Sequence, residues 1–169
     1  TLNEEQKNIQ GILSAVKMLA TENLAFELVL VGPASASLEE RVRQSGIERW
    51  VRLRGEIPYK DVAKEMQQGD AFVLFSRYEN FPCVVVEALC CGLPVIASDV
   101  VGIREALTSS NGILVEKDNE QQLFEGMRHV LINSDNYNRW EISERASHLY
   151  NYTRIGKEFF DLYKEVLRK

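Results

Sequence analysis

Short apolar runs rich in β-branched residues alternate with helical patterns over the first two thirds of the chain. This alternation is typical of a parallel sheet covered by helices on both faces, because parallel strands are usually joined by helical crossovers. The sequence therefore predicts an α/β fold, a Rossmann-like parallel sheet with helices on both faces, followed by a helical C-terminus. Strands are predicted near Phe26–Val31, Trp50–Leu53, Ala71–Phe75, Pro94–Ala97 and Gly112–Val115. Helices are predicted near Glu4–Glu22, Ser37–Ser45, Tyr59–Gln68, Pro82–Cys91 and Ile103–Leu107, and from Glu120 onward.

The first predicted helix carries an apolar stripe that suits a helix lying on a sheet. The stripe consists of Ile9, Ile12, Leu13, Val16 and Leu19, which recur at helical spacing. A doubly wound domain normally opens with a strand. Two interpretations therefore stay open: a preceding segment is missing, or the fold begins with a helix.

The size and charge of the chain exclude several classes of protein. With 169 residues, 45% of them hydrophobic, the chain can bury an ordinary core, so we expect one globular domain over residues 1–169. Disordered, collagen-like and disulfide-scaffold chains are excluded. The 20 basic and 25 acidic side chains give a net charge of −5, which argues against binding to nucleic acid.

Cysteine usage and hydropathy predict a cytoplasmic protein. The cysteines are Cys83, Cys90 and Cys91, an odd number without a CxxC pair, which suits a reducing compartment and predicts no structural zinc site. No apolar run approaches the roughly 20 residues that span a bilayer, so we expect no transmembrane segment in this chain. The opening TLNEEQKN also lacks the basic and apolar regions of a signal peptide.

The stretch from Ser76 to Pro94, SRYENFPCVVVEALCCGLP, holds the residues best suited to binding chemistry. It follows a predicted buried strand and leads into a helix, with Pro82 predicted at the first helical position, where its missing N–H is not needed. In open α/β sheets, ligands bind beyond the carboxyl ends of the strands, and the free amides of a helix start favour anions. We therefore expect an anionic ligand at this junction.

Two carboxylates lie in this stretch. Glu87 has apolar neighbours on both sides in the sequence, so its carboxylate must reach a polar group, stay protonated or face a cleft. Glu79 precedes the helix in a loop. Without a ligand, it would be interpreted as a solvated loop residue or as a partner of the helix dipole. The two carboxylates could flank one ligand, one from the loop and one from the helix.

The pair forms an E-x7-E pattern inside S-R-Y-E-N-F-P-x4-E-A-L-x-C-G-L-P-V-I-A-S. This pattern resembles the donor-binding signature of retaining glycosyltransferases of the GT-B fold, which include glycogen synthases and bacterial mannosyl- and glucosyltransferases. The whole chain is similar to the C-terminal, nucleotide-sugar-binding half of such an enzyme. Further matches follow the family's order and spacing at Lys7-Asn8, Leu28–Gly32, Val51–Gly55, Asp70–Leu74, Asp99–Glu105 and Gly112–Val115.

The resemblance implies a role for each residue of a donor-binding site. Glu79 would contact the hydroxyls of the transferred sugar, as the catalytic residue, and Glu87 would contact the ribose hydroxyls of the nucleotide. Lys7 would meet the diphosphate, a task that suits the point charge of an ammonium group. The loop between the two carboxylates would offer backbone amides to the phosphates and the sugar. Its residues are Asn80, Phe81, Pro82, Cys83 and Val84, of which Pro82 has no amide to donate.

The resemblance also places a few residues at the rim of this site. Gly32 and Pro33 would end a strand where the donor comes close to the backbone, and the absence of a Cβ at Gly32 would allow that approach. Glu56 and Ile57, after Gly55, would lie in the loop that meets the nucleobase, largely through backbone groups. Arg104 and Glu105 are expected to begin a helix and to form either a surface ion pair or part of the site.

The expected activity is retaining transfer of a sugar from a UDP- or GDP-linked donor to an acceptor glycan or lipid in polysaccharide synthesis, without a cofactor or a metal. The resemblance also implies an N-terminal acceptor domain outside this chain, so we expect the chain alone to be inactive. Any peripheral contact of the enzyme with a membrane is expected to be made by that N-terminal domain. The alternatives are half of a sugar-nucleotide epimerase, a non-catalytic sugar-nucleotide-binding module and, least favoured, a flavodoxin-like receiver.

Overall fold

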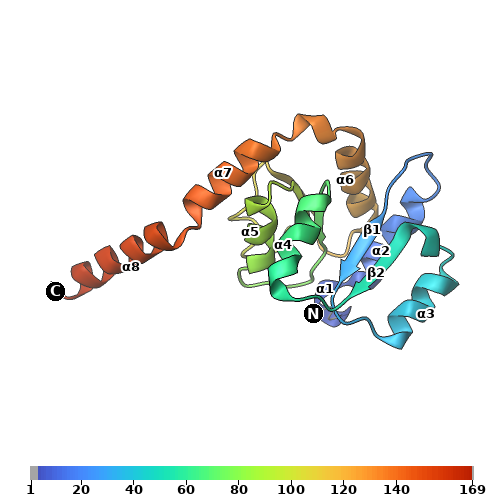
Figure 1. Cartoon of the computed structure of the whole chain (residues 1–169), viewed down its shortest axis with the longest axis horizontal. Coiled ribbons are helices and arrows are strands. Elements are labelled where there is room, and N and C mark those ends of the chain that lie inside the picture. The colour runs from blue at the N-terminus through green and yellow to red at the C-terminus, as the bar shows by residue number, and fades with distance from the viewer. Residues whose placement is uncertain (1–3, 169) are drawn as a thin grey trace.

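The computed structural model describes residues 4–168, in which strands alternate with helices and are then followed by helices alone (Figure 1). All five predicted strands are confirmed to within a few residues. They are β1 (Leu28–Val31), β2 (Val51–Gly55), β3 (Phe72–Leu74), β4 (Val95–Ser98) and β5 (Gly112–Val115). The α-helices are α1 (Glu4–Lys7), α2 (Ile9–Leu19), α3 (Ala36–Gln44), α4 (Tyr59–Gln68), α5 (Cys83–Cys90), α6 (Glu120–Ile132), α7 (Arg139–Leu149) and α8 (Tyr152–Val166). Two short 3₁₀ helices are η1 (Glu48–Trp50) and η2 (Ser134–Asn136).

Every strand pairing is parallel, as the alternation of strands and helices predicts. Backbone hydrogen bonds join β1 to β2 in one sheet and β3, β4 and β5 in that order in another. Because the strands are parallel within each sheet, their carboxyl ends meet at one edge, where loops from different parts of the sequence come together.

Helices cover both faces of the larger sheet. Successive residues of a strand point to opposite faces, and β4 is buried along its whole length. Ile96 belongs to a core cluster with residues of α2 and α6, whereas Val95 and Ala97 belong to a second cluster with residues of α5 and α7. The predicted arrangement of a sheet between two helical layers is therefore confirmed.

The predicted first helix is divided at Asn8. This residue adopts a left-handed conformation, with φ +47°, and its side chain accepts a hydrogen bond from the amide of Gly11, which caps the start of α2. The predicted apolar stripe of this segment is buried throughout. An added Cβ at Gly11 would lie 2.7 Å from the ring of Phe75, so α2 packs closely against the end of β3.

The predicted helix at Ile103–Leu107 is wrong. Residues 101–106 form consecutive turns, with bonds from the amides of Ile103 and Ala106 to carbonyls three residues earlier. The side chain of Asn111 closes the segment, because it accepts from the amide of Thr108 and donates to the carbonyl of Ala106. Ile103 and Leu107 are nevertheless buried, which explains why the segment has a helix-like apolar spacing.

Helix α7 packs against α5, whereas α8 leads away from the body of the molecule (Figure 1). No residue of α8 is buried, and its exposed side chains include Phe159, Phe160 and Tyr163. Among the helices of residues 4–168, none combines the length and apolar character needed to cross a membrane.

Candidate functional site

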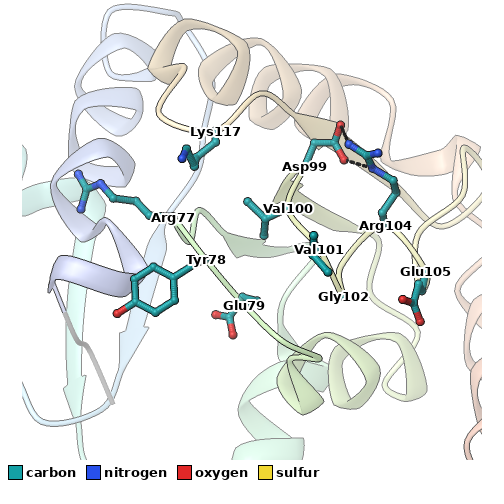
Figure 2. Close-up of a pocket in the computed structure, with 10 residues that line it drawn as sticks. All are labelled: Arg77, Tyr78, Glu79, Asp99, Val100, Val101, Gly102, Arg104, Glu105 and Lys117. Atoms are coloured by element: carbon teal, nitrogen blue, oxygen red, sulfur yellow. Dashed lines mark hydrogen bonds and ion pairs between the residues drawn. The ribbon is translucent and has the colours of Figure 1, made fainter.

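A cavity of about 580 Å³ opens where the carboxyl ends of β3, β4 and β5 meet. Figure 2 shows its lining residues on the loops that follow β3 and β4, with Lys117 after β5. The lining consists of Arg77, Tyr78, Glu79, Asp99, Val100, Val101, Gly102, Arg104, Glu105 and Lys117. The candidate site thus lies at the edge of the sheet that the sequence predicts.

Glu79 lies at the end of this cavity that adjoins α1. Its Oε1 accepts hydrogen bonds from Lys7 Nζ at 2.5 Å and from Ser76 Oγ at 2.8 Å, and its Oε2 lies 3.4 Å from Gln6 Nε2. The side chain of Glu79 is 8% exposed and that of Lys7 is 21% exposed. The structure therefore brings Lys7 and Glu79 into direct contact, 72 positions apart in the sequence.

Arg77 holds the N-terminal segment against the loop that carries Glu79. Its guanidinium donates to the carbonyl of Glu5 at 2.8 Å, to Asn8 Oδ1 at 2.8 Å and to Asp118 Oδ1 at 2.9 Å. Its backbone amide donates to the carbonyl of Gln6 at 2.8 Å. Sequence reasoning did not assign this network, although Asn8 and Arg77 both lie inside the quoted motifs.

The loop between the two carboxylates runs from the cavity into α5. Pro82 is the N-cap residue, in an extended conformation, and α5 begins at Cys83, so the prediction of Pro82 as the first helical residue is wrong by one position. The amide of Val85 bonds to the carbonyl of Pro82. Because the first amides of a helix have no partner within the helix, those of Cys83 and Val84 can donate to a ligand.

A close backbone approach fixes the position of this loop. Gly102 has φ +86°, and an added Cβ would lie only 1.5 Å from the carbonyl oxygen of Asn80. Phe81, on the same loop, packs its ring against Tyr150 with 6.1 Å between the ring centroids. Pro82 is buried, whereas Asn80 and Cys83 are exposed.

Glu87 lies on α5 and is half-buried. Its Oε1 accepts a hydrogen bond from the hydroxyl of Tyr59 at 2.9 Å, and this bond raises the pKa of Tyr59 above its ordinary value of 10.0. The expectation that Glu87 reaches a polar group is confirmed. Glu79 and Glu87 are both half-buried residues, so the enclosure that the apolar neighbours of Glu87 suggest is only partial.

The remaining predicted residues lie around the ends of β1 and β2. Gly32 follows β1 with φ +137°, a conformation that residues with a Cβ rarely adopt, and its amide donates to the carbonyl of Gly55 at 2.9 Å. Ile57 is half-buried in the loop before α4. Pro33 lines a separate hollow of about 310 Å³ together with Glu4, Ser35, Ser37, Leu38 and Arg41.

Arg104 pairs with Asp99 and does not begin a helix with Glu105. Its Nε and Nη2 donate to the two carboxylate oxygens of Asp99 at 2.6 and 2.8 Å (Figure 2), and this pairing raises the pKa of Arg104 above its ordinary value. The pair therefore holds the far wall of the cavity. Within residues 4–168, no three His, Cys, Asp or Glu side chains gather in an arrangement that could hold a metal ion.

Known proteins that this chain resembles are glycosyltransferases. The O-antigen chain mannosyltransferase B of Escherichia coli is 32% identical over 108 residues, which make up 62% of this chain and 28% of that protein. The alpha-D-kanosaminyltransferase of Streptomyces kanamyceticus is 23% identical over 168 residues, covering 95% of this chain and 43% of that protein. The chain spans less than half the length of these relatives.

Solved structures share the fold. The sucrose-phosphate synthase of Thermosynechococcus elongatus superposes with a TM-score of 0.84 at 24% identity, over 96% of this chain and 43% of that one. HepE of Anabaena, solved in complex with UDP, gives a TM-score of 0.82 at 21% identity, over 95% of this chain and 46% of that one. The architecture is that of the C-terminal half of the GT-B fold. Residues 2–147 match the family described as glycosyl transferases group 1, and the chain belongs to that family.

Proposed function

We propose that this chain is the donor-binding domain of a retaining glycosyltransferase, which holds a nucleoside-diphosphate sugar at the carboxyl edge of the sheet. The contact between Lys7 and Glu79 carries the proposal, because it joins a cation suited to a diphosphate and a carboxylate suited to sugar hydroxyls at one end of the cavity. The division of the remaining roles follows the E-x7-E resemblance: ribose on Glu87, and the base near Ile57.

The chain's own residues would act by position and charge. Transfer breaks the bond between the anomeric carbon and a diphosphate oxygen and forms a bond from that carbon to the acceptor oxygen on the same face. The proton of the acceptor hydroxyl passes to the departing diphosphate. Lys7 and the amides at the start of α5 would stabilise the negative charge that develops on the departing diphosphate. Glu79, held by Ser76 and Lys7, would orient the sugar through its hydroxyls.

The acceptor would be brought by a domain outside this chain, so the chain would bind donors without turning them over. The relatives named above include a mannosyltransferase and a kanosaminyltransferase. Because these names differ in the transferred sugar, they support sugar transfer as a class and favour no particular sugar. The complex of HepE with UDP supports a nucleotide-linked donor. A glycan or lipid acceptor, and the absence of a required metal, belong to the same proposal.

Calorimetry and thermal shift with UDP- and GDP-linked sugars test this function. The chain is expected to bind at least one of them and to be stabilised by an amount that rises with the logarithm of ligand concentration above the dissociation constant. Lys7→Ala is expected to reduce the stabilisation at a given ligand concentration, whereas Lys17→Ala, at an exposed lysine near the end of α2, should leave it unchanged. Absence of binding to every donor would refute the proposal, and detectable sugar transfer by the chain alone would refute its dependence on another domain.

A further inference from the structure

Tyr59 stands out as an exposed aromatic residue with a polar partner in the proposed donor site. The residue is 78% exposed, yet its hydroxyl donates to Glu87 Oε1 at 2.9 Å. It is the first residue of α4 and follows the loop that contains Ile57. Tyr59 therefore connects the loop that we propose for the nucleobase with the carboxylate that we propose for the ribose.

The backbone of Tyr59 is held in place by the rest of α4. Glu65 of this helix accepts a hydrogen bond from Arg54 of β2 at 2.7 Å. Met66 packs against the core cluster that contains α5, and the thiol of Cys91 lies 3.9 Å from the carbonyl of Ala63. Both a strand and a neighbouring helix thus fix the position from which Tyr59 reaches Glu87.

The two carboxylates differ in how many donors they already have. Glu79 accepts from Lys7 and Ser76 and lies within hydrogen-bond distance of Gln6. Glu87 accepts from Tyr59, and within residues 4–168 it forms no salt bridge. An ionised carboxylate has about four lone-pair sites on its two oxygens. One bond from Tyr59 to Oε1 therefore fixes the carboxylate and leaves Oε2 open to a pair of hydroxyls.

We infer that Tyr59 is a positioning residue for the donor, whose hydroxyl holds the Glu87 carboxylate in the orientation that accepts the ribose hydroxyls of a nucleoside diphosphate. This inference rests on the proposed function and adds to it a residue of α4 that the E-x7-E pattern does not contain. Fixing a long, flexible side chain before binding removes part of the entropic cost of ordering it in the complex.

Calorimetric titrations with UDP, GDP and their 2′-deoxyribose counterparts test the inference on the chain as it stands. The measured quantity is the ratio of affinities for the ribose and deoxyribose forms. Tyr59→Phe keeps the ring and removes the hydroxyl, and it is expected to lower this ratio by about three- to tenfold, the factor that corresponds to one net hydrogen bond. Its affinity for the deoxyribose form is expected to change much less.

Two further variants separate positioning from a general effect on the fold. Glu87→Ala is expected to remove the ribose preference, and adding Tyr59→Phe to it should then change nothing, because the hydroxyl acts through Glu87. Tyr163→Phe, at an exposed tyrosine of α8, is the matched control and should keep the wild-type ratio. The melting temperature of Tyr59→Phe should stay near that of the wild type, since the ring is largely exposed.

The outcomes distinguish this inference from the proposed function. If the wild-type chain prefers ribose and Tyr59→Phe keeps that preference, or weakens both nucleotides equally, the positioning role is refuted while donor binding stands. Tighter ribose binding by Tyr59→Phe would also refute it, because the hydroxyl would then compete with the ligand. If the wild-type chain binds neither diphosphate, the proposed function fails, and the role of Tyr59 fails with it.

Discussion

The ammonium group of Lys7 and the carboxylate of Glu79, which lines the cavity, are 2.5 Å apart, and each neutralises the other in the absence of ligand. A diphosphate that approaches Lys7 must therefore compete with Glu79 or share the ammonium with it. Because Ser76 also donates to the same oxygen of Glu79, the carboxylate stays partnered when Lys7 turns toward a phosphate. Substitutions of Lys7 and of Glu79 are therefore expected to affect the affinity for different parts of the ligand.

Lys7→Ala is expected to weaken nucleoside diphosphates by about 10- to 100-fold and nucleosides much less. The reason is that a hydrogen bond from a charged group contributes roughly 1.5–3 kcal/mol, and a nucleoside has no phosphate to receive it. Isothermal titration with uridine, guanosine and their diphosphates measures the difference, with Lys17→Ala as the control. Equal losses for nucleoside and diphosphate would show that Lys7 does not meet the diphosphate.

Glu79→Gln is expected to affect only ligands that carry the sugar. Removing the negative charge releases Lys7, so affinity for the plain diphosphate should be unchanged or higher, while the sugar nucleotide loses a charged hydrogen bond to its hydroxyls. The measurement compares UDP with UDP-glucose and GDP with GDP-mannose in both proteins. If Glu79→Gln weakens the plain diphosphate as much as the sugar nucleotide, the assigned division of roles is wrong.

Local pattern is sufficient to predict the strands and most of the helices of the fold. Alternating apolar runs located all five strands, and the stripe from Ile9 to Leu19 located the buried face of α2, because both depend on short-range periodicity. The apolar spacing predicts a helix at 103–107 because Ile103 and Leu107 are buried at helical spacing. The backbone forms turns instead, because Gly102 has a positive φ and the Asn111 side chain bonds to the carbonyl of Ala106. Apolar spacing in the sequence does not reveal these two features.

The surroundings of the candidate site depend on residues far apart in the sequence. The side chain of Glu79 is nearly buried because Lys7 and Ser76 enclose it, and Lys7 lies 72 positions away. Glu87 was expected to be enclosed by its apolar neighbours, but it is only half-buried and turns toward Tyr59, 28 positions away. The motif indicated which carboxylates matter, and tertiary packing determined the environment of each.

The cysteines are expected to differ in reactivity. Cys83 is exposed at the start of α5, whereas burial, with a smaller effect of Cys90 and Glu87, raises the pKa of Cys91 above its ordinary value of 9.0. Since the thiolate is the reactive form, iodoacetamide at pH 8 should modify Cys83 first and Cys91 slowly. Peptide mass spectrometry measures the rates, and a bound sugar nucleotide should protect Cys83 if its loop meets the ligand. A Cys91 that reacts as fast as Cys83 would contradict this prediction.

Alkaline pH is expected to destabilise the chain partly through two tyrosines. Burial raises the pKa of both Tyr137 and Tyr150 above the ordinary value of 10.0. The folded state therefore holds these protons more tightly than the unfolded state, so their contribution is complete below pH 10 and is lost as the pH rises through the raised values. Denaturant unfolding between pH 9 and 11 should show a smaller alkaline loss for Tyr150→Phe than for the wild type. An identical loss in both proteins would exclude Tyr150 as a source.

Gly102→Ala is expected to damage both stability and donor binding. The added Cβ would meet the carbonyl of Asn80 at 1.5 Å, in a backbone conformation with φ +86° that already disfavours a side chain. The matched control is Gly46→Ala, where φ is +68° and no atom lies within 4 Å of the added Cβ. The control is expected to lose only about 1–2 kcal/mol of stability, from the strain of a left-handed backbone conformation. Gly102→Ala adds overpacking of roughly 1–3 kcal/mol or forces the loop at Asn80 to move.

Urea unfolding should therefore show a clearly larger loss of stability for Gly102→Ala, and calorimetry should show weakened sugar-nucleotide binding for that variant alone. Equal losses in the two variants would mean that the 102 turn yields without disturbing the loop, and that the close approach at Asn80 does not position the donor site.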